Sequence, residues 1–206
     1  MSARAPAPAD HEYSVSVRGD GRRDPGLLSP KLQARLEREL TDTIAAGLAH
    51  AGLMPAGGSA ELAGWVDAFF QHYAERPIRD NAGGSGFNDA LWLFVAARAV
   101  RPARIVESGT HRGFSGWVLR QACPDAPVDS FDVDTSRVDW RDPGFRVTQG
   151  EWTAHVAADP ANAEALAFFD DHISHARRVA EAHARGFRWL LLDDNFRATQ
   201  LHATGG

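Results

Sequence analysis

Short apolar segments recur through the second half of the chain, and helical patterns or polar turns separate them. Segments of about four to eight mainly apolar residues that end at turn residues are typical of buried strands. We therefore predict strands over residues 103–108, 127–134, 145–150, 165–171 and 188–194. Buried strands that alternate with helices predict an α/β fold with a Rossmann-like, doubly wound parallel sheet.

Helical patterns dominate the first half of the chain. Leucine and isoleucine recur every four residues between 32 and 48, after a proline that suits a first helical turn. Apolar residues between 62 and 73 have helical spacing, and a third helix is predicted over residues 88–100. We expect a disordered tail over residues 1–25, a helical extension that packs on the sheet or acts as a lid over 26–101, and the α/β domain over 102–206.

Composition narrows the classes of partner. The chain has 206 residues, 44% of them hydrophobic, which is enough for one domain with a substantial core. Its net charge of −5 does not favour a nucleic-acid partner, and no apolar run reaches the roughly 18 residues of a membrane span. A single cysteine excludes an internal disulfide framework and agrees with a cytoplasmic protein. We expect a small-molecule substrate, and the leucine-striped first helix offers a surface for a homo-oligomer.

The most informative stretch follows the first predicted strand. Residues 107–113 read Glu-Ser-Gly-Thr-His-Arg-Gly and lead into a predicted helix over 114–122. Glycine lets the backbone approach a ligand closely, and the first turn of a helix presents unpaired N–H groups. The layout is typical of a loop that cradles a nucleotide, although similar turns also join strands to helices for structural reasons alone. A dehydrogenase fits less well, because His111 stands where G-x-G-x-x-G has its middle glycine.

A second glycine-rich loop, residues 80–86, precedes the third predicted helix. A loop in that place could close over a cofactor or substrate, and it could equally be a plain linker.

The spacing of Glu107, Gly109 and Gly113 resembles motif I of class I S-adenosylmethionine (SAM)-dependent methyltransferases. The resemblance implies that this loop, with Thr110 and His111, wraps the methionine part of SAM.

The resemblance also assigns residues after the next two strands. It implies that Asp132, with Asp134 as its neighbour, binds the ribose hydroxyls, and that Glu151 and Trp152 contact the adenine. A solvated glutamate and a packed tryptophan explain the last two residues equally well.

Acidic residues close the last two predicted strands. Asp170-Asp171-His172 follows one, and Asp193-Asp194-Asn195 follows the other. Because neighbouring parallel strands lie about 4.8 Å apart, the side chains at their ends can converge. Several carboxylates in one cleft repel each other unless a cation lies between them, and Mg²⁺ or Ca²⁺ prefers such oxygen ligands.

This pair of acidic ends resembles the metal-dependent catechol-type O-methyltransferases. The resemblance implies that Asp171, Asp194 and Asn195 bind Mg²⁺, which would hold a substrate hydroxyl near the SAM methyl group. His172, beside Asp171, would then act as a catalytic base. The stretch around His172 also resembles sugar O-methyltransferases and cephalosporin-hydroxylase-like proteins, which share this fold.

The resemblance covers about residues 81–195. Class I methyltransferases have two further strands beyond that point, so we expect a shortened relative or a truncated fragment. The sequence thus favours a SAM-dependent, Mg²⁺-assisted O-methyltransferase acting on a small hydroxylated molecule. The alternatives are another Rossmann-like biosynthetic enzyme, hydroxylase-like or sugar-modifying, and a non-catalytic relative.

Overall fold

A single parallel sheet organises the protein. The structure is a computed structural model that describes residues 30–193, with side chains from residue 34 onward. Its strands are β1 (Arg104–Ser108), β2 (Val128–Asp132), β3 (Phe145–Gln149), β4 (Ala165–Phe169) and β5 (Trp189–Leu192). They pair in the order β3-β2-β1-β4-β5, and every pairing is parallel. The predicted Rossmann-like α/β fold is confirmed.

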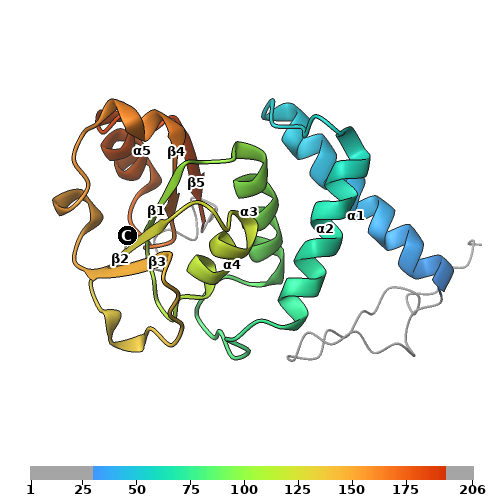
Figure 1. The fold of residues 1–206 in the computed structure, drawn as a ribbon, viewed down its shortest axis with the longest axis horizontal. Coiled ribbons are helices and arrows are strands. Elements are labelled where there is room, and N and C mark those ends of the chain that lie inside the picture. Colours follow the sequence, from blue (N-terminus) through green and yellow to red (C-terminus); the bar gives the residue numbers. More distant parts are fainter. Residues whose placement is uncertain (1–29, 194–206) are drawn as a thin grey trace, which may run out of the picture.

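Helices cover both faces of this sheet (Figure 1). They are α1 (Pro30–His50), α2 (Gly58–Ala74), α3 (Phe87–Val100), α4 (Phe114–Ala122) and α5 (His175–Ala184). Figure 1 shows α3 and α4 against one face, α5 on the other side of the strands, and α1 and α2 outside α3. The helical extension therefore packs onto the sheet through α3.

The alternation of side chains along the strands divides the core in two. In β1, Ile105 joins a cluster that extends through α4, α3 and α2 to α1. The next residue, Val106, joins a smaller cluster on the other face, with Ala182 of α5 and Trp152. Adjacent residues at a strand end therefore point to opposite sides of the sheet, which decides the roles of the acids described below.

Three strands end two residues earlier than the pattern predicted. β2, β4 and β5 end at 132, 169 and 192, whereas the pattern predicted 134, 171 and 194. One further backbone hydrogen bond follows β4 and one follows β5, because the N–H of Asp170 donates to the oxygen of Ser108 and the N–H of Asp193 donates to the oxygen of Phe169, both at 2.9 Å. Asp170 and Asp171 thus lie in the loop after β4, where their side chains can bind other groups.

The connection from β3 to β4 contains short 3₁₀ turns, η3 (Trp152–Ala154) and η4 (Pro160–Glu164), in place of an α-helix. Another 3₁₀ turn, η2 (Thr135–Arg137), lies between β2 and β3. The Asp159 side chain accepts a hydrogen bond from the N–H of Ala161 at 2.8 Å, and Pro160 occupies the first turn of η4. The connection from β3 to β4 and α5 cover the second face together, through Trp152, Val156 and Ala182.

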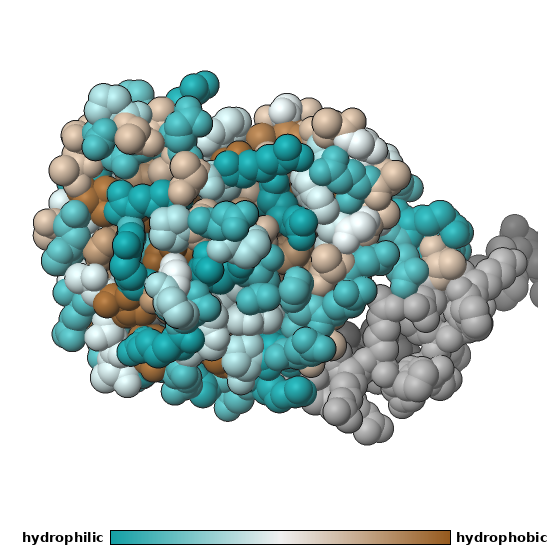
Figure 2. All heavy atoms as spheres, in the orientation of Figure 1, coloured by the Kyte–Doolittle hydropathy of each residue, from teal (hydrophilic) through white to brown (hydrophobic). Residues whose placement is uncertain are grey.

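The face seen in Figure 2 is mainly hydrophilic, with apolar atoms in small separate patches. Within residues 30–193, no helix combines the length and apolar character needed to cross a membrane.

Candidate cofactor site

The candidate site lies at the carboxyl ends of β1 and β4. These strands are neighbours, but the helix after β1 packs on one face of the sheet and the helix after β4 packs on the other. In open α/β sheets, this point of divergence leaves a crevice where ligands bind. The loop after β1, residues 109–113, is the predicted glycine motif, and residues 170–174 follow β4.

The first motif glycine is required by the fold itself. Gly109 has a φ of +102°, and a Cβ atom on it would lie 2.1 Å from the backbone oxygen of Asp170. Gly113 has a φ of +89° and forms the N-cap of α4. The two glycines therefore let the β1 loop lie against the end of β4 and start α4, so their presence alone does not identify a cofactor.

Asp132 fixes the shape of this loop. Its Oδ2 atom accepts hydrogen bonds from the backbone N–H groups of Thr110 and His111, both at 2.9 Å. Its Oδ1 atom accepts one from the N–H of Asp134 at 3.0 Å. A carboxylate has about four acceptor positions, so most of those on Asp132 bind the protein's own backbone. The predicted ribose ligand lies at the crevice, with little hydrogen-bonding capacity left.

Asp134 caps a 3₁₀ turn. The residue is exposed, and its carboxylate accepts the N–H of Ser136 at 2.9 Å, which caps η2. Hydrogen bonds from Ser136 hold the pKa of Asp134 below its ordinary value.

Glu107 is the unusual acid of the site. It is completely buried in β1, and its Oε2 atom accepts a hydrogen bond from Ser130 Oγ. Burial raises its pKa to about 7; the hydroxyls of Ser115 and Ser130 lower it in part, and the charges of Asp170 and Asp132 raise it further. A buried carboxyl group with such a pKa is typical of functional sites, although structural networks can produce it too.

Unsatisfied polar atoms gather around the β1 loop. In the part of the chain that the structure describes, buried side-chain atoms without a hydrogen-bond partner are Asn81 Oδ1, Glu107 Oε1, His111 Nδ1 and Trp152 Nε1. Asn81 and His111 line the same hollow beside the loop, and Glu107 lies in the strand that leads into it, whereas Trp152 lies apart from these three in the second core cluster. Since buried polar atoms are usually paired, this cluster indicates a position for a ligand or an ordered water.

The loop of residues 80–86 covers this hollow. Ser85 Oγ lies 3.2 Å from Asp170 Oδ2 and 3.4 Å from Asp193 Oδ2, so one hydroxyl contacts the ends of both β4 and β5. Arg112 donates a hydrogen bond to the backbone oxygen of Asp80. The enclosed space is about 10 Å³, whereas small-molecule sites have roughly 300–1,000 Å³. A cofactor could enter only if this loop moved.

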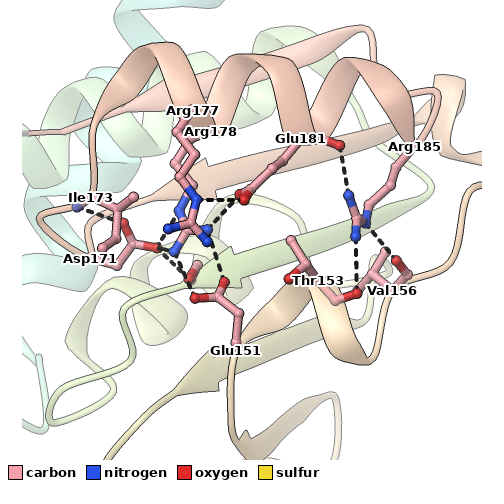
Figure 3. A network of polar contacts seen from close by, with 10 residues as sticks. Glu151, Thr153, Val156, Asp171, Ile173, Arg177, Arg178, Glu181 and Arg185 are labelled. Atoms are coloured by element: carbon pink, nitrogen blue, oxygen red, sulfur yellow. Dashed lines mark hydrogen bonds and ion pairs between the residues drawn. The ribbon is translucent and has the colours of Figure 1, made fainter.

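A second group of charges lies on the α5 face of the sheet (Figure 3). The Arg178 side chain is 1% exposed, and it forms ion pairs with Asp171 at 2.7 Å, Glu151 at 2.9 Å and Glu181 at 2.6 Å. Burial by itself would lower the pKa of Arg178, but the hydrogen bonds that it donates to these carboxylates raise the pKa above its ordinary range. The guanidinium therefore stays charged and is the buried cation of this group.

Asp171 is fully engaged by this network. Its Oδ2 atom accepts hydrogen bonds from Ser108 Oγ at 2.5 Å and from Arg178 Nε at 2.9 Å. Its Oδ1 atom accepts the N–H of Ile173 at 3.2 Å. The donor set does not fit a metal ion at Asp171, because a guanidinium already lies against the oxygen that the metal would need. Asp194 and Asn195, the other predicted ligands, lie outside the described residues, and within residues 30–193 no group of three His, Cys, Asp or Glu side chains could hold a metal ion.

The two residues expected to contact adenine have structural partners. Glu151 binds Arg178, with a second contact at 3.3 Å. Trp152 is 0% exposed and packs against Phe169 and Phe187 in the second core cluster. Trp152 thus presents no surface to a ring in this structure, and packing explains it.

His172 lies at the same edge of the sheet but outside α5, which begins at His175. It is exposed and has a φ of +57°, a left-handed conformation that is uncommon outside glycine. His175 Nε2 lies 2.7 Å from the backbone oxygen of Asp193 and thereby joins α5 to the end of β5.

Sequence reasoning missed several residues of this edge. Asn81 and Ser85 come from the covering loop, which the sequence left open as a lid or a linker. The sequence did not indicate that Arg178 is buried, because a basic residue in a helix rich in Arg and His is expected to be solvated. A hydrophobic period of 3.6 over α5 places Ala182 inward, and Arg178, four residues earlier, shares that side of the helix.

A larger hollow, of about 430 Å³, opens at the opposite edge of the sheet, near Pro102 and Ala126. Arg98 and Trp65 line it, and Arg101 pairs with Glu61 there at 3.3 Å. Because the Arg101 side chain is 66% exposed there and the unsatisfied buried atoms lie elsewhere, we place the candidate site at the β1 loop.

No protein-family model matches this chain, and no curated protein matches it either.

Proposed function

We propose that this chain binds SAM at the carboxyl ends of β1 and β4 and transfers its methyl group to a hydroxyl of a small molecule. The observation that carries the proposal is the cluster of unsatisfied acceptors, Glu107 Oε1 and Asn81 Oδ1, beside a glycine loop at the divergence point of the sheet. Acceptor oxygens in a buried place suit a ligand that brings N–H donors. The strand order and the spacing of Glu107, Gly109 and Gly113 support the same choice.

The roles of the protein groups follow from their positions. Glu107 would accept a hydrogen bond from the ligand, and Asp132 would hold the loop amides of Thr110 and His111 in place for it. The loop of residues 80–86 would exclude water once the ligand is bound, because it already packs over the hollow. SAM, when bound, supplies an activated methyl group.

A substrate hydroxyl must lose its proton as its oxygen takes the methyl group. His172 is the group we propose as proton acceptor, because it lies in the loop after β4, three residues beyond the strand, and is exposed. A neutral imidazole ring can accept a proton through its unprotonated nitrogen, which suits this role. Asp171 is not proposed as its partner, since Arg178 and Ser108 bind that carboxylate.

Isothermal titration calorimetry tests the proposal directly. SAM and S-adenosylhomocysteine should each bind one site, and NAD⁺ should not. Above pH 7, where the Glu107 carboxyl group is ionised, Glu107→Gln should weaken SAM binding by about tenfold, because loss of a charge-assisted hydrogen bond costs roughly 1.5–3 kcal/mol. Glu61→Gln is the matched control, since Glu61 lines the hollow at the other edge and should leave the affinity unchanged. Absence of heat with both adenosyl ligands would contradict the proposal.

A non-catalytic role is the second candidate, and the closed crevice of about 10 Å³ favours it. Under that alternative the loop of residues 80–86 would be a permanent plug. The same titration separates the two, because a plug predicts no binding of either adenosyl ligand.

A further inference from the structure

We infer that Arg178 is the resident cation of the acidic end of β4, so that no divalent metal ion binds at Asp171. The inference refines the proposed methyl transfer. The resemblance to metal-dependent O-methyltransferases had implied that Mg²⁺ binds at Asp171. It depends on the geometry around Arg178 and is tested without SAM, so the inference and the proposed SAM binding can each fail independently of the other.

The first argument is charge. Three carboxylates, those of Asp171, Glu151 and Glu181, lie within 2.9 Å of the guanidinium nitrogens. Carboxylates gathered this closely need a positive charge between them. The cation expected from the sequence is therefore present, but it is a side chain of α5.

The second argument is geometry. Mg²⁺ needs oxygen ligands at about 2.0–2.1 Å in near-octahedral arrangement. Asp171 Oδ2 instead accepts Ser108 Oγ at 2.5 Å, Arg178 Nε at 2.9 Å and Arg178 Nη2 at 2.7 Å. A metal ion could reach this oxygen only after displacing a fully buried guanidinium.

The third argument is connectivity. Arg178 binds Asp171 in the loop after β4 and also binds Glu151, which lies two residues beyond the end of β3. Asp171 in turn contacts Ser108, the last residue of β1. A planar guanidinium with five donors can serve several carboxylates at once. It thus holds the carboxyl ends of three strands, which a bound metal ion would otherwise have to do.

The neighbouring arginine shows that this role belongs to position 178. Arg177 also pairs with Glu181, at 2.7 Å, but its side chain is 56% exposed and contacts neither strand end in any ion pair within the described residues. The two arginines share chemistry and differ in burial, so Arg177 is a matched control.

The test is a melting experiment on the full-length protein with MgCl₂ as the only added ligand. The wild-type protein should keep its Tm when millimolar MgCl₂ or a chelator is added. Arg178→Met should gain a response, with Tm rising by about 4 °C, because three carboxylates then lack a cation. Arg178→Lys, which keeps a positive charge, and Arg177→Met should show no gain.

Asp171→Asn covers the case in which Arg178→Met does not fold. A saturable Mg²⁺ effect in the wild type that Asp171→Asn abolishes would overturn the inference. A wild-type effect that persists in Asp171→Asn would place the metal ion elsewhere and support Arg178 as the cation at Asp171.

Discussion

The two sides of the carboxyl edge of the sheet treat buried acids in opposite ways. On the α4 side, Glu107 is completely buried beside serine hydroxyls, keeps one oxygen unsatisfied and has a pKa of about 7. On the α5 side, Asp171 is surrounded by donors, and Arg178 neutralises it. Unsatisfied polar atoms cost free energy and persist where something else selects for them, whereas a saturated network is explained by stability. The comparison therefore supports the proposal that a ligand binds on the α4 side, while the Arg178 network gives structural support on the α5 side.

The largest expected effect is on the α5 side. Arg178→Met should lower the free energy of unfolding by about 3–5 kcal/mol, because it leaves buried carboxylates without their cation. Arg177→Met should change it by less than about 0.5 kcal/mol, since exposed ion pairs contribute little. Urea denaturation of both variants measures the difference. Equal losses would show that the α5 network is no more structural than a surface pair.

On the α4 side, the buried carboxyl group of Glu107 should make the free energy of unfolding depend on pH. The folded protein keeps the Glu107 proton up to a pH of about 7, whereas the unfolded chain loses it near the ordinary glutamate pKa of 4.5. The contribution to the free energy of unfolding is therefore full below pH 4.5, falls as the pH rises and levels off above 7. The total loss is about 3 kcal/mol.

Glu107→Gln should remove that part of the pH dependence. The measurement is denaturation of both proteins at a series of pH values, with the Glu107→Gln curve subtracted from the wild-type curve so that other titrating groups cancel. A flat difference between pH 4.5 and 7 would mean that the buried carboxyl group is ionised in the folded state.

The next prediction concerns Asp132, which fixes the shape of the β1 loop. Asp132→Ala removes the acceptor of three backbone N–H groups and should cost about 1–3 kcal/mol, with a larger loss in SAM affinity than in stability. Asp134→Ala, which removes only the cap of η2, should leave SAM affinity unchanged. Denaturation and calorimetry on the same samples separate the two effects. Equal affinity losses would assign Asp132 no special part in forming the loop.

The smallest expected effect concerns the covering loop. Ser85→Ala removes hydroxyl contacts of 3.2 and 3.4 Å, so stability should fall by less than about 1 kcal/mol. SAM affinity should rise by about two- to tenfold, because a closed state that must open first reduces the apparent affinity. Reduced affinity would indicate that Ser85 binds the ligand instead of holding the loop closed.

Hydrophobic patterning predicted the strands and the α/β class well, because buried parallel strands read as apolar segments whatever their ligands. Residues that follow different strands do meet in the described part of the chain, since Gly109 lies against Asp170 and Asp132 binds the loop of Thr110. The pattern could not decide which acid of a pair faces the crevice. Strand side chains alternate, so a shift of one residue moves a carboxylate to the other face.

Asp170 and Asp171 illustrate that limit. Asp170 contacts Ser85 of the covering loop, whereas Asp171 turns toward α5 and Arg178. The same uncertainty applies to helices, where neighbouring arginines at 177 and 178 read alike and only packing decides that one of them is buried. Sequence spacing therefore located the edge of the sheet, and tertiary contacts determined the role of each side chain.

A crystal structure of the full-length protein grown with S-adenosylhomocysteine tests the central claim most directly. Ligand density should lie along residues 109–113 and beside Glu107, with residues 80–86 displaced from the position described above. Density in the hollow lined by Arg98 and Trp65, with the loop of residues 80–86 still closed over the β1 end, would contradict the account.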